Sequence, residues 1–314
     1  MRSCGATPMS SEPVVLPPHW RPWQRRKNNF LYGLIATTLF VMRRVPYVLL
    51  VGLGTLAGAL GFIVAWGDRT RALRQLRLAM PELRTPRRTI FTLFVHLGRM
   101  GAEWLHIGRF TRPGSPHVDW DNFEDLQAAL AVGRGALVVV PHIGNWELAA
   151  QALARRGVRC TTVAKRLYDP RLTALVEDFR QDSGLRCLWR GDTSVREEMR
   201  EVLQRGEVLG MLIDQDTKTR GVFVPFFHTV AHTPIIPAEL ACEAKSEVVF
   251  AHGIRVRGRY VIHFERVPRP DTGQLSPDAT ALTAELSYRI ERLVRRVPAQ
   301  WMWLHRRWRT RPVH

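Results

Sequence analysis

The sequence predicts an α/β fold, a mixed and mostly parallel sheet flanked by helices, preceded by an N-terminal hydrophobic membrane-associating helical segment. Two observations lead to this class. From about residue 115 onward, short apolar runs typical of buried strands alternate with helical patterns. Residues 45–66 carry no charged side chain, over a length that matches the roughly 20 residues needed to cross a bilayer. We therefore expect three parts: a flexible basic leader over 1–27, the hydrophobic segment over 28–67 and an α/β domain over 68–314.

The hydrophobic segment permits more than one arrangement. Its apolar run from residue 30 is interrupted by Arg43 and Arg44, and the uncharged stretch follows. Tyr47 and Trp66 place aromatic rings near the two ends of that stretch, as at membrane interfaces. Basic flanks on both sides fit a helix, or a hairpin of two helices over 30–66, that dips into the cytoplasmic leaflet. A crossing helix and a buried core helix are the alternatives.

The elements of the α/β domain follow from periodicity and from turn residues. Pro86 fits the first turn of a helix, where a proline is favoured. In chain order we expect helices over 69–80, 86–108 and 122–130, a strand over 136–140, a helix over 146–156, a strand over 158–164, a helix over 170–182, a strand over 185–189, a helix over 194–205, a strand over 208–213, a helix over 233–244, a hairpin of strands over 248–256 and 260–265, and a helix over 278–297.

The charge of the chain predicts acidic partners. The formal net charge is +18 and the pI is about 11.1. Nucleic acid, an anionic membrane surface, or an acidic substrate or carrier protein would each fit this balance. The basic residues are nearly all arginine, which suits two-point binding of phosphate and carboxylate. Codon preference in a GC-rich genome is the alternative explanation of that excess.

The cysteines predict neither a disulfide framework nor a zinc site. Cys4, Cys160, Cys187 and Cys242 are far apart in sequence and form no CxxC pair. We therefore expect free thiols in a reducing compartment.

A histidine and a glutamate stand at the joint between an expected strand and the next helix. Ala136–Val140 is the apolar run, Gly144 allows a tight turn, and Asn145 can cap the following helix. His142 then lies at the carboxyl edge of the sheet, where ligands gather in open α/β folds, and Glu147 lies in the first helical turn. A carboxylate bound to one ring nitrogen would fix the tautomer and make the histidine a general base. Glutamate is also common in first helical turns for its effect on the helix dipole, so the spacing alone does not establish catalysis.

The full string His142-Ile-Gly-Asn-Trp-Glu147 resembles the His-x4-Glu signature of the lipid A biosynthesis (late) acyltransferases, a branch of the lysophospholipid acyltransferase superfamily. Further stretches resemble family motifs in the same order, and the resemblance runs from about residue 30 to 312. They are the arginine-rich stretch 69–83 ending in PEL, Glu103, Lys165-Arg166 with Asp169-Pro170, Asp214-Gln215-Asp216, Phe223–Phe227, Ala231-x-Thr233-Pro234, Gln300–Trp303 and His305–Arg307.

The resemblance implies transfer of a fatty acyl chain from an acyl-carrier-protein thioester to a hydroxyl of a membrane glycolipid, most simply a lipid A precursor. His142 would deprotonate the hydroxyl and Glu147 would orient His142. Backbone N–H groups at the start of the Asn145 helix, or a nearby arginine, would stabilise the oxyanion. The resemblance further implies six substrate-binding candidates: Asn145, Arg166, Asp214, Asp216, Thr233 and Arg306.

Two histidines depart from the family pattern. His228 stands where the family has glycine, and His232 lies between Ala231 and Thr233. Each is either an exposed loop histidine or a contact for the acceptor head group, which leaves the acceptor's identity open.

The resemblance also implies partners and a location. Acyl carrier protein is the expected acyl donor, with acyl-CoA as the alternative, and a phosphorylated glycolipid and an anionic membrane surface are the other partners. We expect neither a metal nor another cofactor, and the expected place is the cell inner membrane with the active site facing the cytoplasm. A mannosylated phosphatidylinositol or an aminolipid is the alternative acceptor. A membrane-attached basic binding protein without catalysis is the third interpretation, although no nucleic-acid-binding module is evident and nucleic acid is not an expected partner.

Overall fold

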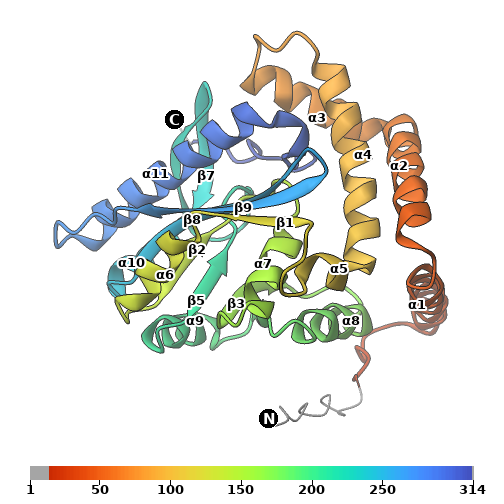
Figure 1. Ribbon diagram of the computed structural model, residues 1–314, viewed down its shortest axis with the longest axis horizontal. Coiled ribbons are helices and arrows are strands. Elements are labelled where there is room, and N and C mark those ends of the chain that lie inside the picture. The colour runs from red at the N-terminus through yellow and green to blue at the C-terminus, as the bar shows by residue number, and fades with distance from the viewer. Residues whose placement is uncertain (1–13, 313–314) are drawn as a thin grey trace.

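The computed structural model describes residues 14–312, and five helices open this part of the chain (Figure 1). They are α1 (Pro22–Met42), α2 (Tyr47–Val64), α3 (Trp66–Ala79), α4 (Pro86–Leu105) and α5 (Ile107–Thr111). The two hydrophobic patterns of the sequence are therefore two helices joined near Arg44. Helix α1 begins at Pro22, so residues 22–27 of the expected leader are helical. The first part of the leader, residues 1–13, and with it Cys4, lies outside the described residues.

Glycines let α2 and α4 lie unusually close together. A Cβ at Gly54 would come within 2.4 Å of the carbonyl oxygen of Gly98, and one at Gly58 within 2.3 Å of that of Phe94. Small residues four apart on a helix allow such backbone contact, which is a common way for apolar helices to associate. The pair α2–α4 attaches the hydrophobic segment to the rest of the fold.

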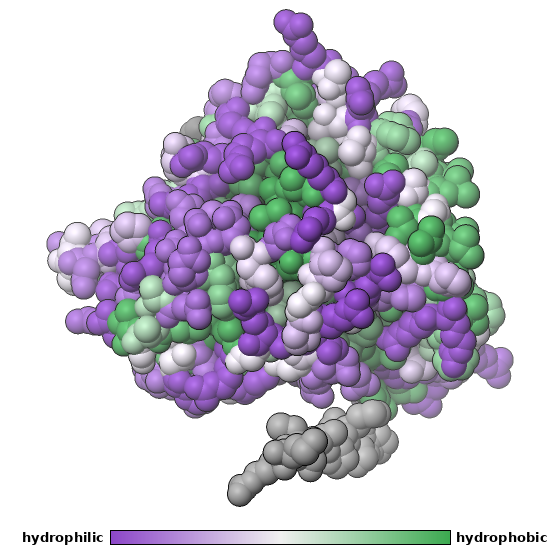
Figure 2. Space-filling view, viewed as in Figure 1, coloured by the Kyte–Doolittle hydropathy of each residue, from purple (hydrophilic) through white to green (hydrophobic). Residues whose placement is uncertain are grey.

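The hydrophobic segment exposes its apolar side chains. Only Leu50 and Gly58 of α2 are buried, and α2 is the one helix within the described residues that is long and apolar enough to cross a membrane. Eighteen residues of helix span about 27 Å. Figure 2 shows green apolar surface along the margin formed by α1 and α2. The exposed large side chains there are Phe30, Leu31, Leu34, Ile35, Phe40, Val41, Val48, Leu49, Leu53, Leu56, Leu60, Ile63 and Val64. This arrangement is that of a membrane-associating segment and excludes the buried core helix.

Seven strands form one twisted sheet in the order β1-β9-β8-β2-β5-β3-β4. Their bounds are β1 (Val118–Asp121), β2 (Ala136–Val139), β3 (Cys160–Lys165), β4 (Arg186–Arg190), β5 (Val208–Met211), β8 (Glu247–Val256) and β9 (Arg259–Val267). All neighbours pair in parallel except β8 and β9, which form the antiparallel hairpin expected from the sequence. The fold is therefore the mixed, mostly parallel sheet flanked by helices that the sequence predicts.

Helices cover both faces of this sheet (Figure 1). With α5, helices α6 (Phe123–Ala131), α7 (Trp146–Arg155) and α8 (Pro170–Gln181) pack on one face. Helices α9 (Val195–Gln204), α10 (Ile236–Glu243) and α11 (Leu275–Arg296) pack on the other. Strand β2 is buried on both sides, because Ala136 and Val138 join one apolar core while Leu137 and Val139 join the other.

Strand β1 and a separate two-stranded hairpin differ from the sequence expectation. Strand β1 was not predicted, and the segment expected to begin a helix at Thr233 is instead the second strand of a separate hairpin. That hairpin pairs β6 (Gly221–Phe226) with β7 (Thr229–Pro234), and α10 begins only at Ile236. Pro234 ends the strand, and the hydrogen bonds of the hairpin outweigh the helical pattern of the segment.

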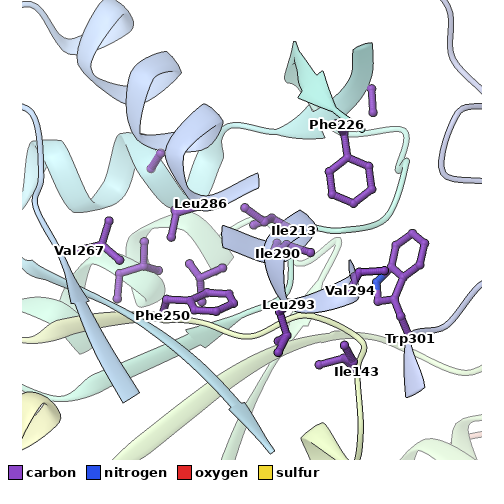
Figure 3. Close-up of a cluster of buried hydrophobic side chains, with 14 of the residues drawn as sticks. Ile143, Ile213, Phe226, Phe250, Val267, Leu286, Ile290, Leu293, Val294 and Trp301 are labelled. Atoms are coloured by element: carbon purple, nitrogen blue, oxygen red, sulfur yellow. The ribbon is translucent and has the colours of Figure 1, made fainter. Parts of the chain in front are cut away.

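Figure 3 shows part of the larger of the two apolar cores. It includes Ile143 and Ile213, each next in sequence to a residue of the site, together with Trp301 after the short helix η1 (Pro298–Gln300). Ile143 also forms a backbone bridge to Trp301. Because well-packed cores allow little movement, the neighbours of these residues are held in fixed positions.

Candidate active site

His142 and Asp214 form a close pair at the carboxyl edge of the sheet. The Nδ1 atom of His142 lies 2.7 Å from Oδ1 of Asp214, and the His142 backbone N–H donates to Oδ2 of Asp214 at 2.8 Å. The indole N–H of Trp301 also donates to Oδ2, at 2.8 Å. Strands β2 and β5 are adjacent and parallel, so the loops that follow them meet at one edge. The carboxylate is thus oriented by three donors.

Two neighbours complete the setting of His142. An ionised Asp214 requires a proton on Nδ1, which leaves the lone pair of Nε2 as an acceptor. The amide nitrogen of Gln215 lies 2.7 Å from that Nε2 and 2.6 Å from Nε2 of His305. The amide can therefore donate one hydrogen to each imidazole. An acceptor hydroxyl that approached Nε2 of His142 would take the place of the Gln215 amide.

The carboxylate that hydrogen-bonds to His142 is that of Asp214, and not that of Glu147 as expected. Glu147 forms a two-point ion pair with Arg180, with contacts of 2.9 and 2.8 Å, and accepts a third hydrogen bond from Gln151 at 3.0 Å. Its position on α7 turns it toward α8, whereas Asp214 approaches the imidazole from the loop that follows β5. Glu147 still lines the same cavity as His142.

A tight turn at Gly144 follows His142 at the sheet edge. Gly144 has φ of +59°, and a Cβ there would come within 2.0 Å of the Gly253 carbonyl oxygen. The N–H groups of Gly144 and Asn145 are already used, since they donate to the carbonyls of Gln300 and Gly253. These two N–H groups are therefore not available to an oxyanion, whereas the expected role concerned the N–H groups at the start of α7 in general or a nearby arginine.

Asn145 itself has a structural position. Its side chain accepts from the Leu148 N–H at 3.0 Å as the N-cap of α7 and donates to Glu103 at 3.2 Å. Glu103 is fully buried, paired with Arg255 and hydrogen-bonded by the Tyr260 hydroxyl at 2.5 Å. The side chain of Asn145 is buried among these partners, so direct substrate binding by this residue is not supported.

An apolar cavity of about 420 Å³ opens beside His142. Near the site it is lined by Glu147, Arg180 and Gln215. Deeper walls come from α7 and from strands β2, β5, β8 and β9, with Ala149, Leu153, Val138, Val208, Gly210, Ala251, Ile262 and Phe264. This volume and this mixture of an apolar interior with a few polar groups are typical of small-molecule sites.

The other predicted residues lie elsewhere. Arg166 is half exposed and paired with Asp192 at 2.7 Å. The Asp216 side chain is buried and accepts a hydrogen bond from the backbone N–H of Thr310 at 2.6 Å. It therefore holds the C-terminal segment, residues 301–312, against the loop after β5. Thr233 is buried and accepts from Arg307 at 2.6 Å. Arg306 is exposed and lines a different cavity. Of the six substrate-binding candidates, only Asp214 touches His142.

The two unusual histidines differ in setting. His228 is exposed in the turn between β6 and β7. His232 is half-buried in β7, with its Nδ1 3.6 Å from Asp216. Neither lines the cavity beside His142.

Sequence reasoning missed four residues of the site. Gln215 and His305 contact or approach His142, Trp301 orients Asp214, and Arg180 holds Glu147. Three of them stand in stretches that carried the family resemblance, which was the available signal. Arg180 stands in an ordinary amphipathic helix pattern and had none. Among residues 14–312, no group of three or more histidine, cysteine, aspartate or glutamate side chains is arranged to hold a metal ion.

Burial, charge and hydrogen bonds set the protonation states of Asp214 and His305. Burial alone would raise the pKa of Asp214, but the His142 charge and the hydrogen bonds of His142 and Trp301 hold it at about 2. Burial, with the neighbouring His142 charge, lowers the pKa of His305 to about 4, so His305 is neutral at pH 7. Burial opposes the charge of Arg180, but hydrogen bonds and the charge of Glu147 raise its pKa above the ordinary value. Asp214 is therefore ionised and His305 is neutral at pH 7.

The chain resembles known proteins over most of its length. Residues 22–310 match the family described as bacterial lipid A biosynthesis acyltransferase. A phosphatidylinositol mannoside acyltransferase of Mycobacterium tuberculosis is 32% identical over 188 residues, which cover 59% of this chain and only 58% of that protein. A lipid A biosynthesis palmitoleoyltransferase of Escherichia coli is 24% identical over 96% of this chain and 95% of its own length. A lipid A biosynthesis lauroyltransferase of Escherichia coli is 25% identical over 97% and 96%.

Three findings point to the same family. They are the apolar cavity beside a histidine–aspartate pair at the edge of the sheet, the attached hydrophobic helix, and the family match over nearly the whole chain. The protein belongs to the bacterial lipid A biosynthesis acyltransferase family.

Proposed function

We propose that the protein transfers a fatty acyl chain from an acyl-carrier-protein thioester to a hydroxyl of a membrane glycolipid. The observation that carries the proposal is the His142–Asp214 pair at the mouth of an apolar cavity of about 420 Å³. The cavity would hold the acyl chain, since each buried methylene contributes about 0.8 kcal/mol. The chain's net charge of +18 supports an acidic carrier as donor and a phosphorylated acceptor.

In the proposed reaction His142 acts as a general base and then as a general acid. Its Nε2 takes the proton of the acceptor hydroxyl as that oxygen attacks the thioester carbonyl carbon. The C–S bond then breaks, and the imidazolium returns the proton to the leaving sulfur. Asp214 fixes the Nδ1–H tautomer and stabilises the imidazolium, which is the role first assigned to Glu147.

Arg180 is our candidate for stabilising the oxyanion. Its guanidinium lines the cavity, is largely buried and is fixed by Glu147 in two-point contact. Glu147 then acts through Arg180 as a positioning residue.

A lipid A precursor is the acceptor we propose first, because the relatives named for lipid A biosynthesis align over almost the whole chain. A mannosylated phosphatidylinositol is the second candidate, because the relatives named for it show higher identity over their shorter alignment. The exposed apolar surface of α1 and α2 supports a place at the cell inner membrane, and the acyl-carrier-protein donor requires that the active site face the cytoplasm.

Lipid analysis tests the function directly. Purified protein would be incubated with acyl-carrier-protein thioester, or with acyl-CoA, and with either acceptor, and the products would be weighed by mass spectrometry. We expect one added acyl chain on one acceptor, and a loss on the order of 10²-fold or more in His142→Ala. Unchanged turnover in that variant, if it is folded, contradicts the mechanism. Absence of transfer to either acceptor contradicts the assignment.

A further inference from the structure

A second cavity, of about 570 Å³, lies between α3 and the C-terminal segment. Its lining is dominated by arginine, and Trp66 stands at its edge. The arginines are Arg71 and Arg74 from α3 and Arg306, Arg309 and Arg311 from the C-terminal segment. Two segments more than 230 residues apart in sequence therefore bring five guanidinium groups to one hollow.

Most of this charge is not neutralised by the protein. Arg71 pairs with Asp68 at 2.7 Å, and Arg309 pairs with Asp216 at 3.3 Å. Arg74, Arg306 and Arg311 are exposed and have no acidic partner within residues 14–312. Guanidinium groups that converge without carboxylates match the geometry and the charge of a phosphate.

The position of the cavity indicates where its ligand lies. Trp66 is 68% exposed and stands two residues beyond Val64, the end of the apolar helix α2. Tryptophan at such a boundary is typical of the head-group level of a membrane. The cavity is thus next to the surface that α2 would enter.

The cavity is also built firmly and joined to the active site. The buried side chain of Gln75 donates to the carbonyl oxygen of Trp303 at 2.7 Å and accepts from the Arg307 N–H at 2.8 Å. This clamp fixes the C-terminal segment on α3. The segment includes His305, whose ring approaches His142, with 5.2 Å between the centroids. Arg306 is the next residue, so one segment contributes to both places.

We propose that the arginine-lined cavity binds the phosphate group of a membrane lipid head group. Arg166, the sequence-based candidate for phosphate, is paired with Asp192, which leaves this cavity as the better phosphate site. The inference rests on the proposed function only in placing α2 at a membrane. The phosphate can belong to the glycolipid acceptor or to a surrounding anionic phospholipid, and the two sources require separate tests.

The first test measures lipid binding without turnover. Full-length protein in a neutral detergent would be titrated with phosphatidic acid or with diacylglycerol of the same chains, and bound lipid would be counted by native mass spectrometry. We expect preference for phosphatidic acid, and an affinity about 30-fold lower in Arg74→Gln/Arg306→Gln. Arg257→Gln/Arg292→Gln is the matched control, because both arginines are exposed, lie outside this cavity and have no acidic partner within residues 14–312.

Three results would overturn the proposal. They are equal binding of phosphatidic acid and diacylglycerol, wild-type affinity in the cavity variant, and an equal loss in the control variant. These binding measurements require no acyl transfer, so they test the cavity even if the proposed acyl transfer is not observed. Conversely, a protein that transfers acyl chains can still show no preference for phosphatidic acid.

The second test separates the two sources of phosphate. Transfer would be followed with the lipid acceptor that the wild-type protein uses. If the acceptor supplies the phosphate, the cavity variant raises KM for that acceptor while kcat changes little. If a surrounding phospholipid supplies it, KM is unchanged and only the binding of phosphatidic acid is lost. Wild-type binding of phosphatidic acid by the cavity variant would contradict both sources of phosphate.

Discussion

His142 Nδ1 lies 2.7 Å from Asp214 Oδ1, although the two residues are 72 positions apart in sequence. Glu147, only five positions from His142, is instead paired with Arg180. Because Asp214 and not Glu147 contacts His142, we expect substitution of Asp214 to act on catalysis directly. We expect substitution of Glu147 to act through the position of Arg180.

Replacing Asp214 by asparagine should lower catalysis while the protein still folds, because the change removes the carboxylate that fixes the tautomer of His142. The amide cannot hold Nδ1–H and stabilise an imidazolium as a carboxylate does, so we expect kcat to fall by about 10²- to 10⁴-fold. Asp192→Asn is a matched control, since Asp192 is exposed and its carboxylate contacts only Arg166 among the described residues. Circular dichroism would verify the fold of both variants. Wild-type turnover in Asp214→Asn would remove Asp214 from the mechanism.

The Glu147–Arg180 pair should behave as one unit. Glu147→Gln leaves a largely buried guanidinium without its carboxylate, which costs about 3 kcal/mol of the free energy of unfolding. The double variant Glu147→Gln/Arg180→Gln should recover part of that stability, because neither charge remains unpaired. Its activity should stay low if Arg180 stabilises the oxyanion. Denaturant unfolding and kcat measured on the same samples would show this, and full activity in the double variant would contradict the role of Arg180.

Gly144→Ala should damage the site through the backbone. Its φ of +59° is unfavourable for alanine, and the added Cβ would strike the Gly253 carbonyl oxygen. Gly114→Ala is the control, because Gly114 has φ of +70° with open space around it. We expect a stability loss of about 1 kcal/mol for Gly114→Ala and a clearly larger one for Gly144→Ala, with lower kcat only in the latter. Equal losses in thermal unfolding would contradict the steric argument.

Gly210 should influence the length of the transferred acyl chain. It lies in β5 on the cavity wall, and a Cβ there would meet only the Thr161 carbonyl oxygen at 3.7 Å. Gly210→Val should therefore fold and fill part of the cavity. Product analysis with a mixture of acyl donors should show a shift to shorter chains, with a smaller shift in Gly210→Ala. Each methylene excluded corresponds to about 0.8 kcal/mol, or about fourfold in preference. An unchanged product distribution would place the acyl chain elsewhere.

Stability should fall as the pH is lowered from about 6.5. Burial lowers the pKa of His96 to about 4, of His252 to about 3 and of His305 to about 4, whereas the ordinary value is 6.5. Between these values the unfolded chain binds more protons than the folded one, so the free energy of unfolding decreases with falling pH. Asp214 contributes stability above its ordinary pKa of 3.8, and this is lost only as the pH falls through about 2.

The midpoint of thermal unfolding measures this effect. We expect it to drop between pH 6.5 and pH 4, and to drop less in His252→Leu, which removes a buried histidine whose Nδ1 has no hydrogen-bond partner within residues 14–312. If the midpoint of thermal unfolding depends on pH equally in His252→Leu and in the wild type, His252 does not contribute to the loss of stability.

Much of the fold could be predicted because it depends on local pattern. The apolar run before Pro141 was identified as a buried strand, and the structure has β2 there. The uncharged stretch was identified as a helix, and α2 occupies most of it. Strand β1 and the β6–β7 hairpin were missed, because Val118–Asp121 is too short and too polar to show a strand pattern and Thr233–Pro234 stands directly before a helical one.

By itself, the sequence determined that a histidine follows a buried strand at the carboxyl edge of a sheet and that a hydrophobic helix precedes the domain. Only the tertiary structure decided which carboxylate reaches that histidine and where arginines gather. The physical reason is that strand order makes β2 and β5 neighbours and so brings Asp214 to His142, while the direction of α7 turns Glu147 toward Arg180. Likewise, the clamp by Gln75 joins two distant segments into one arginine-lined cavity, and no spacing along the chain records that contact.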